Sequence, residues 1–263
     1  MTLLVTAERV RVGGLGLDPV REDDVVERVA AGLAAGRGGR IVTPNVDICR
    51  LAAADPALGR LVASADLVVA DGMPLVWTAR LLGTPLPERV AGADLLRALS
   101  ARAARHGWPV YLLGGPYGAP ERAARELVRA FPGLRICGAH APAHGFDSCR
   151  EQRAAVRRKV ATARPRLVFV GLGFPRQDLL IAELRRDLPG AWFLGCGAAL
   201  AFAAGMVPRA PWWMRRAGLE WAFRLATEPG RLARRYLVDD LPFAVRLLGR
   251  SLAARLAARL VRR

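Results

Sequence analysis

The sequence predicts an α/β protein with a mostly parallel sheet, helices on both faces of that sheet, and a basic helical appendage at the C-terminus. Short β-rich runs alternate with Ala-, Leu- and Arg-rich segments of helical period, which is typical of a parallel, Rossmann-like sheet. With 263 residues, 52% of them hydrophobic, the chain can bury a large core. The composition becomes more basic after about Gly205, so we expect a sheet domain at 1–205 and the appendage at 206–263.

Six apolar runs bounded by turn-forming residues predict the strands. They are RIVTPN (40–45), ADLVVAD (65–71), PVYLLGG (109–115), LRICGAH (134–140), RLVFVGLG (166–173) and AWFLGCG (191–197). Segments of helical period follow the first five strands. In order, they are VDICRLAAAD (46–55), PLVWTARLLG (74–83), APERAARELVRAF (119–131), REQRAAVRRKVATA (150–163) and PRQDLLIAELRRDL (175–188).

A carboxylate ends the second predicted strand, where Asp71-Gly72 breaks an apolar run. Asp-Gly tolerates the backbone of a turn, so a simple turn is one interpretation. The other is a functional carboxylate, because ligands of such sheets bind outside the carboxyl ends of the strands. Other polar residues and glycines fall at such ends as well, namely Thr43, Asn45, Gly114 and Gly171.

Two segments, YLLGGPYGAPERAA and VFVGLGFPRQDLL, run from a strand through a Gly-rich turn into a helix. Backbone amides in such turns and the helix N-terminus can hold a phosphate. Neither segment is a Walker loop or a full G-x-G-x-x-G fingerprint, so ordinary tight turns are the alternative. Pro175 suits a first helical position, which would place Arg176 and Gln177 beside whatever the turn binds.

Several chemistries are disfavoured. His140 and His144 have a helical metal-ligand spacing, but their segment is rich in Gly and Pro, so we expect no metal site. No Gly-x-Ser-x-Gly elbow is present, and His106 is the only other histidine, which disfavours a triad hydrolase. If the protein acts on a diphosphate without a metal, arginines and helix dipoles would have to stabilise its negative charge.

The formal net charge of +17 predicts a polyanionic partner. Lys159 is the only lysine, so part of the arginine excess reflects a GC-rich coding sequence. A nucleic-acid-binding protein would explain the charge, but no aromatic stacking platform or recognition motif is visible. The four cysteines form no Cys-x-x-Cys pair, which indicates reduced thiols and a cytosolic location.

The N-terminus lacks a basic signal region, and no apolar stretch is long enough to span a bilayer, so membrane contact would be peripheral. Residues 206–263 nevertheless carry thirteen arginines against four carboxylates. Leucines recur every four residues near the end of the chain, and tryptophans precede them, at Leu248, Leu252, Leu256, Leu260, Trp212, Trp213 and Trp221. This pattern predicts a basic amphipathic helix on an anionic membrane. Packing on the sheet domain or on a second copy of the chain, as a homo-oligomer, is the alternative.

Six blocks together resemble the WecG/TagA/CpsF family, glycosyltransferase family 26. They are TPNVDI (43–48), DGMPLVW (71–77), PERVAGADLL (87–96), GLGFPRQD (171–178), RAPWWMRRAGLEW (209–221) and RLATEPGRLARRYL (224–237). The resemblance runs from about residue 10 to about residue 245. It implies an inverting glycosyltransferase that needs no metal or other cofactor. Such an enzyme moves an N-acetylhexosamine-type sugar, N-acetylmannosamine or its uronic acid, from a UDP donor to a polyprenyl-diphosphate-linked N-acetylglucosamine. The reaction belongs to cell-wall or exopolysaccharide biosynthesis at the inner face of the cell membrane.

The resemblance also implies roles for individual residues. Asp71 matches the catalytic base, with Thr43, Asn45 and Arg89 beside it and Gln177 as a further pocket residue. We expect the donor at the glycine turns, at Gly114, Gly115, Gly171 and Gly173. The acceptor diphosphate is expected at arginines of the appendage, Arg224, Arg231 and Arg234. An inverting displacement needs a base for the acceptor hydroxyl, and burial would raise the pKa of Asp71.

One block departs from the family pattern. The sequence GCGAALAFAAG has Leu200 and Ala201 where many relatives carry Phe-Asp, so the donor sugar stays open. A catalytically silent scaffold is a third hypothesis, in which UDP would bind and Asp71→Asn would change nothing.

Overall fold

The computed structural model describes residues 8–261, with side-chain surroundings through residue 257. Its centre is a six-stranded sheet in the order β4-β3-β8-β7-β5-β6, and every neighbouring pair is parallel. The strands are β3 (Gly39–Val42), β4 (Leu67–Val68), β5 (Pro109–Gly114), β6 (Arg135–His140), β7 (Leu167–Gly171) and β8 (Trp192–Gly195). Each lies within or at the margin of a predicted run, so the predicted α/β fold with a parallel sheet is confirmed.

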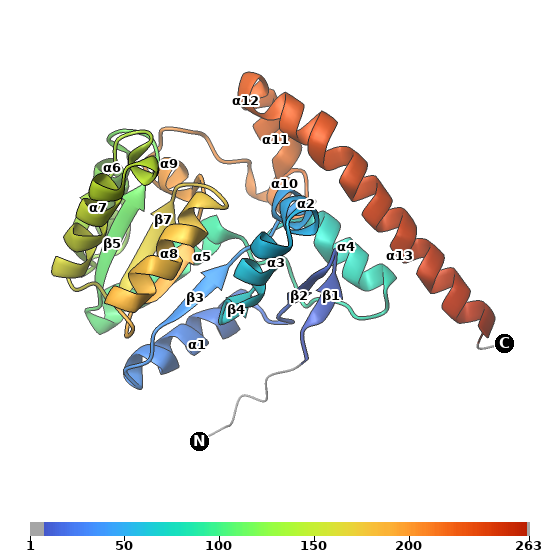
Figure 1. Cartoon of the computed structure of the whole chain (residues 1–263), viewed down its shortest axis with the longest axis horizontal. Helices are drawn as coiled ribbons and strands as arrows, with labels where there is room; N and C mark the ends of the chain where they lie inside the picture. Colours follow the sequence, from blue (N-terminus) through green and yellow to red (C-terminus); the bar gives the residue numbers. More distant parts are fainter. Residues whose placement is uncertain (1–7, 262–263) are drawn as a thin grey trace.

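Helices cover both faces of the sheet (Figure 1). The set comprises α1 (Glu22–Ala34), α2 (Val46–Ala54), α3 (Pro56–Ala63), α4 (Met73–Leu81), α5 (Gly92–His106), α6 (Ala119–Ala130), α7 (Arg150–Thr162), α8 (Arg176–Asp187) and α9 (Ala199–Ala203), with a 3₁₀ turn η1 (Phe146–Ser148) before α7. All five predicted helices are present. The prediction did not include α1, α3, α5 and α9.

Alternate residues of the strands face opposite layers. Leu112 of β5 and Phe169 of β7 pack in one core with helices α1, α5, α6 and α9. Leu113 and Val170, their neighbours in sequence, pack in a second core with α7 and α8. The strands are therefore buried on both faces, which explains why they read as continuous apolar runs rather than as alternating ones.

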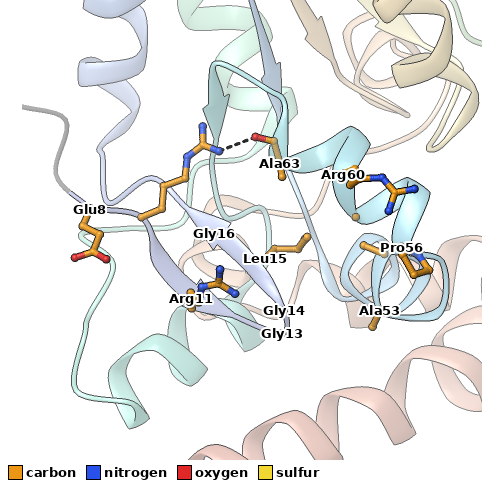
Figure 2. A pocket seen from close by; sticks show the side chains of 13 residues that line it. Glu8, Arg11, Gly13, Gly14, Leu15, Gly16, Ala53, Pro56, Arg60 and Ala63 are labelled. Atoms are coloured by element: carbon orange, nitrogen blue, oxygen red, sulfur yellow. Dashed lines mark hydrogen bonds between the residues drawn. The ribbon is translucent and has the colours of Figure 1, made fainter.

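An antiparallel hairpin precedes the sheet and was not predicted. It joins β1 (Val10–Val12) to β2 (Leu15–Leu17) through Gly13 and Gly14, which both have positive φ. The hairpin packs with α2, α3 and α4 against Val42 and Val68. A shallow hollow lies between the hairpin and helices α2 and α3 (Figure 2), and it contains none of the predicted site residues.

The sheet has a topological switch point between β5 and β7. From β5 the chain crosses through α6 to β6 on one side, and from β7 it crosses through α8 to β8 on the other. The two crossover helices lie on opposite faces. A crevice outside the carboxyl ends is expected where neighbouring connections diverge in this way, and the glycine turns 114–115 and 171–173 begin there.

The chain continues after α9 into a helical C-terminal segment. It consists of α10 (Trp212–Arg216), α11 (Glu220–Thr227), α12 (Pro229–Ala233), a π-helical stretch η2 (Arg234–Asp240) and α13 (Leu241–Val261). Figure 1 shows α13 as a long helix beside α4, with the C-terminus directed away from the sheet. The proposed division into 1–205 and 206–263 stays a prediction.

The predicted C-terminal helix is present as α13, but it carries apolar residues on two sides. Phe243 and Leu247 pack against the core around α4. On the opposite side, Val245, Leu252 and Leu256 are 46–61% exposed. The predicted leucine stripe is therefore about half exposed at Leu252 and Leu256. The side chain of Leu260 lies outside the described residues.

Within residues 8–261, no helix is both long and apolar enough to cross a bilayer.

Candidate active site

Asp71 lies beside Thr43, Pro44 and Asn45 because β3 and β4 are neighbours in the sheet. The backbone N–H of Asp71 donates to the carbonyl of Pro44 at 2.8 Å, just beyond the last paired residues of the two strands. The side chain of Asn45 caps α2, where its Oδ1 accepts from the Ile48 N–H at 3.0 Å. The local sequence thus uses Asn45 to begin a helix and places Asp71 at the adjacent strand end.

The Asp71 carboxylate is held from two sides. Its Oδ2 accepts from the Gly92 N–H at 3.2 Å, at the start of α5, and its Oδ1 accepts from Arg89 Nη1 at 3.3 Å. Thr43 is buried, and a Cβ added to Gly92 would lie only 3.2 Å from its Oγ1. The structure therefore brings the predicted catalytic set of Asp71, Thr43, Asn45 and Arg89 to one place.

Burial raises the pKa of Asp71 to about 6, and the negative charges of Glu220 and Asp94 act in the same direction. Arg89 and the Gly92 amide oppose this rise. The carboxylate is consequently ionised at neutral pH and more basic than an ordinary aspartate. This combination suits a general base, whose pKa is best placed near the working pH.

Arg89 belongs to a larger cluster of alternating charges. Its guanidinium also lies 3.2 Å from Glu220 Oε2 and 3.6 Å from Asp94 Oδ2. Arg209 binds Asp94 through two hydrogen bonds of 2.6 and 2.8 Å, and Arg215 Nη1 lies 3.2 Å from Asp94 Oδ1. The predicted set omitted Asp94, Arg209, Arg215 and Glu220, although all four fall within the sequence blocks that carry the family resemblance.

The glycine turns meet at the switch point between β5 and β7. Gly114, Gly115 and Gly173 have φ values of +94°, +86° and +76°, which favour glycine. The Gly115 N–H donates to the Gly171 carbonyl at 2.7 Å. A Cβ on Gly171 would lie 2.8 Å from the Gly197 carbonyl oxygen, so the close approach of these turns requires glycine there.

Gln177 connects these turns through hydrogen bonds from a buried position. Its side chain is only 4% exposed, and its Oε1 accepts from the N–H groups of Gly173 and Gly197, both at 3.1 Å. In this arrangement Gln177 joins the turn after β7 to the turn after β8. A direct contact of Gln177 with a donor stays a prediction.

The departure at Leu200 and Ala201 lies in the interior. Both side chains are buried, and Leu200 reaches the turn glycines from below, since a Cβ on Gly171 would lie 3.0 Å from its Cδ1. This position therefore supports the turns from within the core. Neither side chain is exposed enough to contact a ligand from the surface.

The three arginines predicted for the acceptor lie in α11, α12 and η2. Glu228 pairs with both Arg224 and Arg231, at 3.8 and 2.5 Å. The guanidinium of Arg224 also lies 5.4 Å from the ring centre of Phe202, in the helix that follows β8. Arg234 is exposed. Phe202 thus brings the first of these arginines to the side of the sheet where its strands end.

Two further features of the structure concern metal ligands and buried charge. His140 ends β6 and is not helical, as expected, and across the described part of the chain no three His, Cys, Asp or Glu side chains group as metal ligands. Arg40 of β3 and Asp178 of α8 form a pair at 3.8 Å in which both side chains are 1% exposed. Burial raises the pKa of Asp178 to about 6. Sequence reasoning did not identify this pair.

Comparison with known proteins places the chain among the glycosyltransferases. Residues 10–257 match the model of the glycosyl transferase WecG/TagA/CpsF family, and the chain belongs to that family. It is also 33% identical, over 81% of its own length and 80% of the relative's, to the N-acetylglucosaminyldiphosphoundecaprenol N-acetyl-beta-D-mannosaminyltransferase of Bacillus spizizenii. The predicted family and enzyme class are confirmed.

Proposed function

We propose that this protein transfers N-acetylmannosamine, or its uronic acid, from a UDP donor to a polyprenyl-diphosphate-linked N-acetylglucosamine. The single observation that carries the chemistry is the Asp71 carboxylate, held at a strand end by Arg89 and the Gly92 amide with its pKa raised to about 6. N-acetylmannosamine and the acceptor follow from the name of the Bacillus spizizenii relative, whereas the uronic acid and the UDP donor follow from the family resemblance of the sequence. The proposed product serves cell-wall or exopolysaccharide biosynthesis.

The donor is assigned to the glycine turns at the β5–β7 switch point. Parallel α/β sheets bind ligands there, and the turns that begin at this point are built from glycines, with positive φ at Gly114, Gly115 and Gly173 and a close backbone approach at Gly171. Because Gln177 already accepts from the Gly173 N–H, we assign Gln177 to shaping this turn.

In the proposed reaction, Asp71 removes the proton from an acceptor hydroxyl as its oxygen attacks the anomeric carbon of the donor sugar. The bond from that carbon to the UDP oxygen breaks, and UDP leaves with the electron pair. A single displacement inverts the anomeric configuration. Without a metal, the developing charge on UDP would be met by arginines and backbone amides.

The acceptor is assigned to the C-terminal segment, where Arg224, Arg231 and Arg234 would hold its diphosphate. Glu228 pairs with the first two arginines, so an acceptor diphosphate would compete with Glu228 for them.

The same segment supports a peripheral location at the inner face of the membrane. Trp212, Trp213 and Trp221 are 46–64% exposed, and α13 has an exposed apolar side. Exposed tryptophans, leucines and arginines on one segment suit an anionic interface.

The product tests this function. Full-length protein would be incubated with vesicle-bound polyprenyl-diphosphate-N-acetylglucosamine, EDTA and one UDP-N-acetylhexosamine or its uronic acid at a time. We expect a lipid-linked disaccharide by mass spectrometry with at least one donor, and a β-linkage by NMR from an α-linked donor. A panel that gives no disaccharide with any donor would contradict the proposal, and an α-linkage would contradict the inverting displacement.

A further inference from the structure

Glu220 is the first residue of α11, and it faces the site from the C-terminal segment. Its Oε2 lies 3.2 Å from Arg89 Nη1, the same nitrogen that lies 3.3 Å from Asp71 Oδ1. The Glu220 and Arg89 side chains are 17% and 14% exposed, so solvent screens them only in part. Two carboxylates from distant parts of the chain therefore share one guanidinium nitrogen.

Specific contacts bring Glu220 to this position. Arg209, which also lies 3.4 Å from Glu220 Oε1, grips Asp94 of α5 through two hydrogen bonds. Gly218 lies directly on α4, where an added Cβ would be 2.4 Å from Met73 Cγ. These contacts seat the segment from residue 206 to residue 240 against α4 and α5. Glu220 can reach Arg89 only when the segment is seated in this way.

The shared nitrogen has a chemical consequence for Asp71. With Glu220 in place, Arg89 divides its attraction between two carboxylates, and the charge of Glu220 adds repulsion. Without Glu220, Arg89 would stabilise the Asp71 carboxylate more fully and make it a weaker base. The seated segment thus makes Asp71 a stronger proton acceptor.

We propose that Glu220 is a positioning residue for the transfer reaction and that, through Arg89, it makes the basicity of Asp71 depend on the seating of residues 206–240. The inference rests on the proposed role of Asp71 as the base. It links acceptor binding to base strength, because the seated segment also carries Arg224, Arg231 and Arg234. Proton removal would then be favoured when the acceptor-binding segment is in place.

Other charged groups lie near Asp71, Arg89 and Glu220. Asp71 faces Arg89, the Gly92 N–H, Asp94 and Glu220. Asp94 in turn faces Arg209, Arg215 and Arg89, which together hold its pKa low. Glu22 lies near Asp94, and its pKa is raised to about 7 by burial and by the charges of Asp94, Glu88 and Asp23. Of the carboxylates that face Asp71, Glu220 alone comes from the C-terminal segment.

The test is a carboxyl ¹³C NMR titration of the full-length protein, with the Asp71 signal assigned by its loss in Asp71→Asn. In the wild type we expect a midpoint near 6. Glu220→Gln should lower that midpoint by about half a unit or more, because a like charge is removed and Arg89 is released toward Asp71. Gly218→Ala, whose added Cβ would clash with Met73 of α4 and so loosen the seat without changing any charge, should lower it as well.

Asp239→Asn is the matched control, because it removes the same charge from the same segment at a residue that does not face Asp71. Its midpoint should equal that of the wild type. An unchanged midpoint in Glu220→Gln, with the fold retained by the other carboxyl signals, would overturn the inference. If Glu220→Gln unfolds, the charge-neutral Gly218→Ala decides the question in the same way.

The titration needs no substrate, so its outcome is separate from that of the proposed function. If the midpoint shifts but the protein makes no disaccharide, the effect of Glu220 on Asp71 is supported and the proposed transferase reaction is contradicted. Disaccharide synthesis with an unshifted midpoint would do the reverse. Where both hold, the rise of kcat/KM with pH should move to lower pH in Glu220→Gln.

Discussion

Replacing Arg89 with Met should move the pH dependence of the reaction in the direction opposite to Glu220→Gln. Arg89 Nη1 lies 3.3 Å from Asp71, and its side chain is 14% exposed. A neighbouring arginine lowers the pKa of a carboxyl group by about 1 to 3 units. Without Arg89, the pKa of Asp71 should therefore rise from about 6 to roughly 7 to 9.

The expected loss of activity follows from the fraction of Asp71 that is ionised. At neutral pH this fraction would fall from about nine tenths to between about one half and about one hundredth, so kcat/KM should fall by about 2- to 100-fold. Raising the pH should restore ionisation. Arg89 could also contribute to binding at every pH, so the diagnostic quantity is the midpoint of the pH profile.

The assay is kcat/KM for UDP release, measured from about pH 5 to about pH 10, because its pH profile reports the pKa of the free enzyme. The rate of the wild type should rise with pH with a midpoint near 6. The midpoint of Arg89→Met should lie at least about one pH unit higher. Arg60→Met, a change of the same type beside the hollow of Figure 2, should keep the wild-type midpoint. A midpoint for Arg89→Met that stays near 6, or falls below it, would refute the electrostatic reasoning.

Three further predictions concern the buried pair, the glycine turns and the acceptor arginines. Asp178→Ala should lower the free energy of unfolding in urea by about 3 to 5 kcal/mol, because it leaves Arg40 buried without its partner. Asp187→Ala, at the partly exposed pair with Arg157, should lower it by about 1 kcal/mol or less. Equal losses in the two variants would contradict the assignment of Arg40 and Asp178 as a buried pair. Gly171→Ala should weaken UDP binding by about tenfold or more in calorimetry, since its Cβ would lie 2.8 Å from the Gly197 carbonyl oxygen. Gly230→Ala is the control, because an added Cβ there meets open space, and it should bind UDP with normal affinity. Replacing Arg224, Arg231 and Arg234 together with Gln should abolish transfer and leave UDP affinity unchanged, and a parallel loss of UDP affinity would show that these arginines serve the donor.

The sheet could be predicted because its strands are buried on both faces. Leu167 to Val170 and Val110 to Leu113 are apolar at every position, and such runs are visible without knowledge of their partners. The hairpin was missed even though Gly13-Gly14 between two short apolar runs is a hairpin signal. Its strands have only three residues each, so the alternation was too short to stand out.

The site was predictable only in part, because its charges come from distant segments. Asp71 could be singled out as a carboxylate at the end of an apolar run. Glu220 and Arg89 are separated by 131 residues, and no local pattern indicates that they share a contact. Gln177 was expected to face a ligand; the structure shows its side chain buried and joining two turns, and a contact with the donor stays a prediction.

Leu200 shows the same limit. Its difference from the family pattern was visible in the sequence, but only the fold places it beneath the glycine turns. A pattern can identify an unusual residue, and packing decides whether that residue faces a ligand or the core.

The most direct test of the central claim compares wild type with Asp71→Asn in acceptor-dependent UDP release. The donor would be UDP-N-acetylmannosamine, or the donor that the product assay identifies, with polyprenyl-diphosphate-N-acetylglucosamine as acceptor and EDTA present. We expect the wild type to release UDP only when acceptor is added. Asp71→Asn should bind UDP normally and lose about 100-fold or more of the rate, since general bases contribute about 10²- to 10⁴-fold. Equal rates in the two proteins would contradict the assignment of Asp71 as the base.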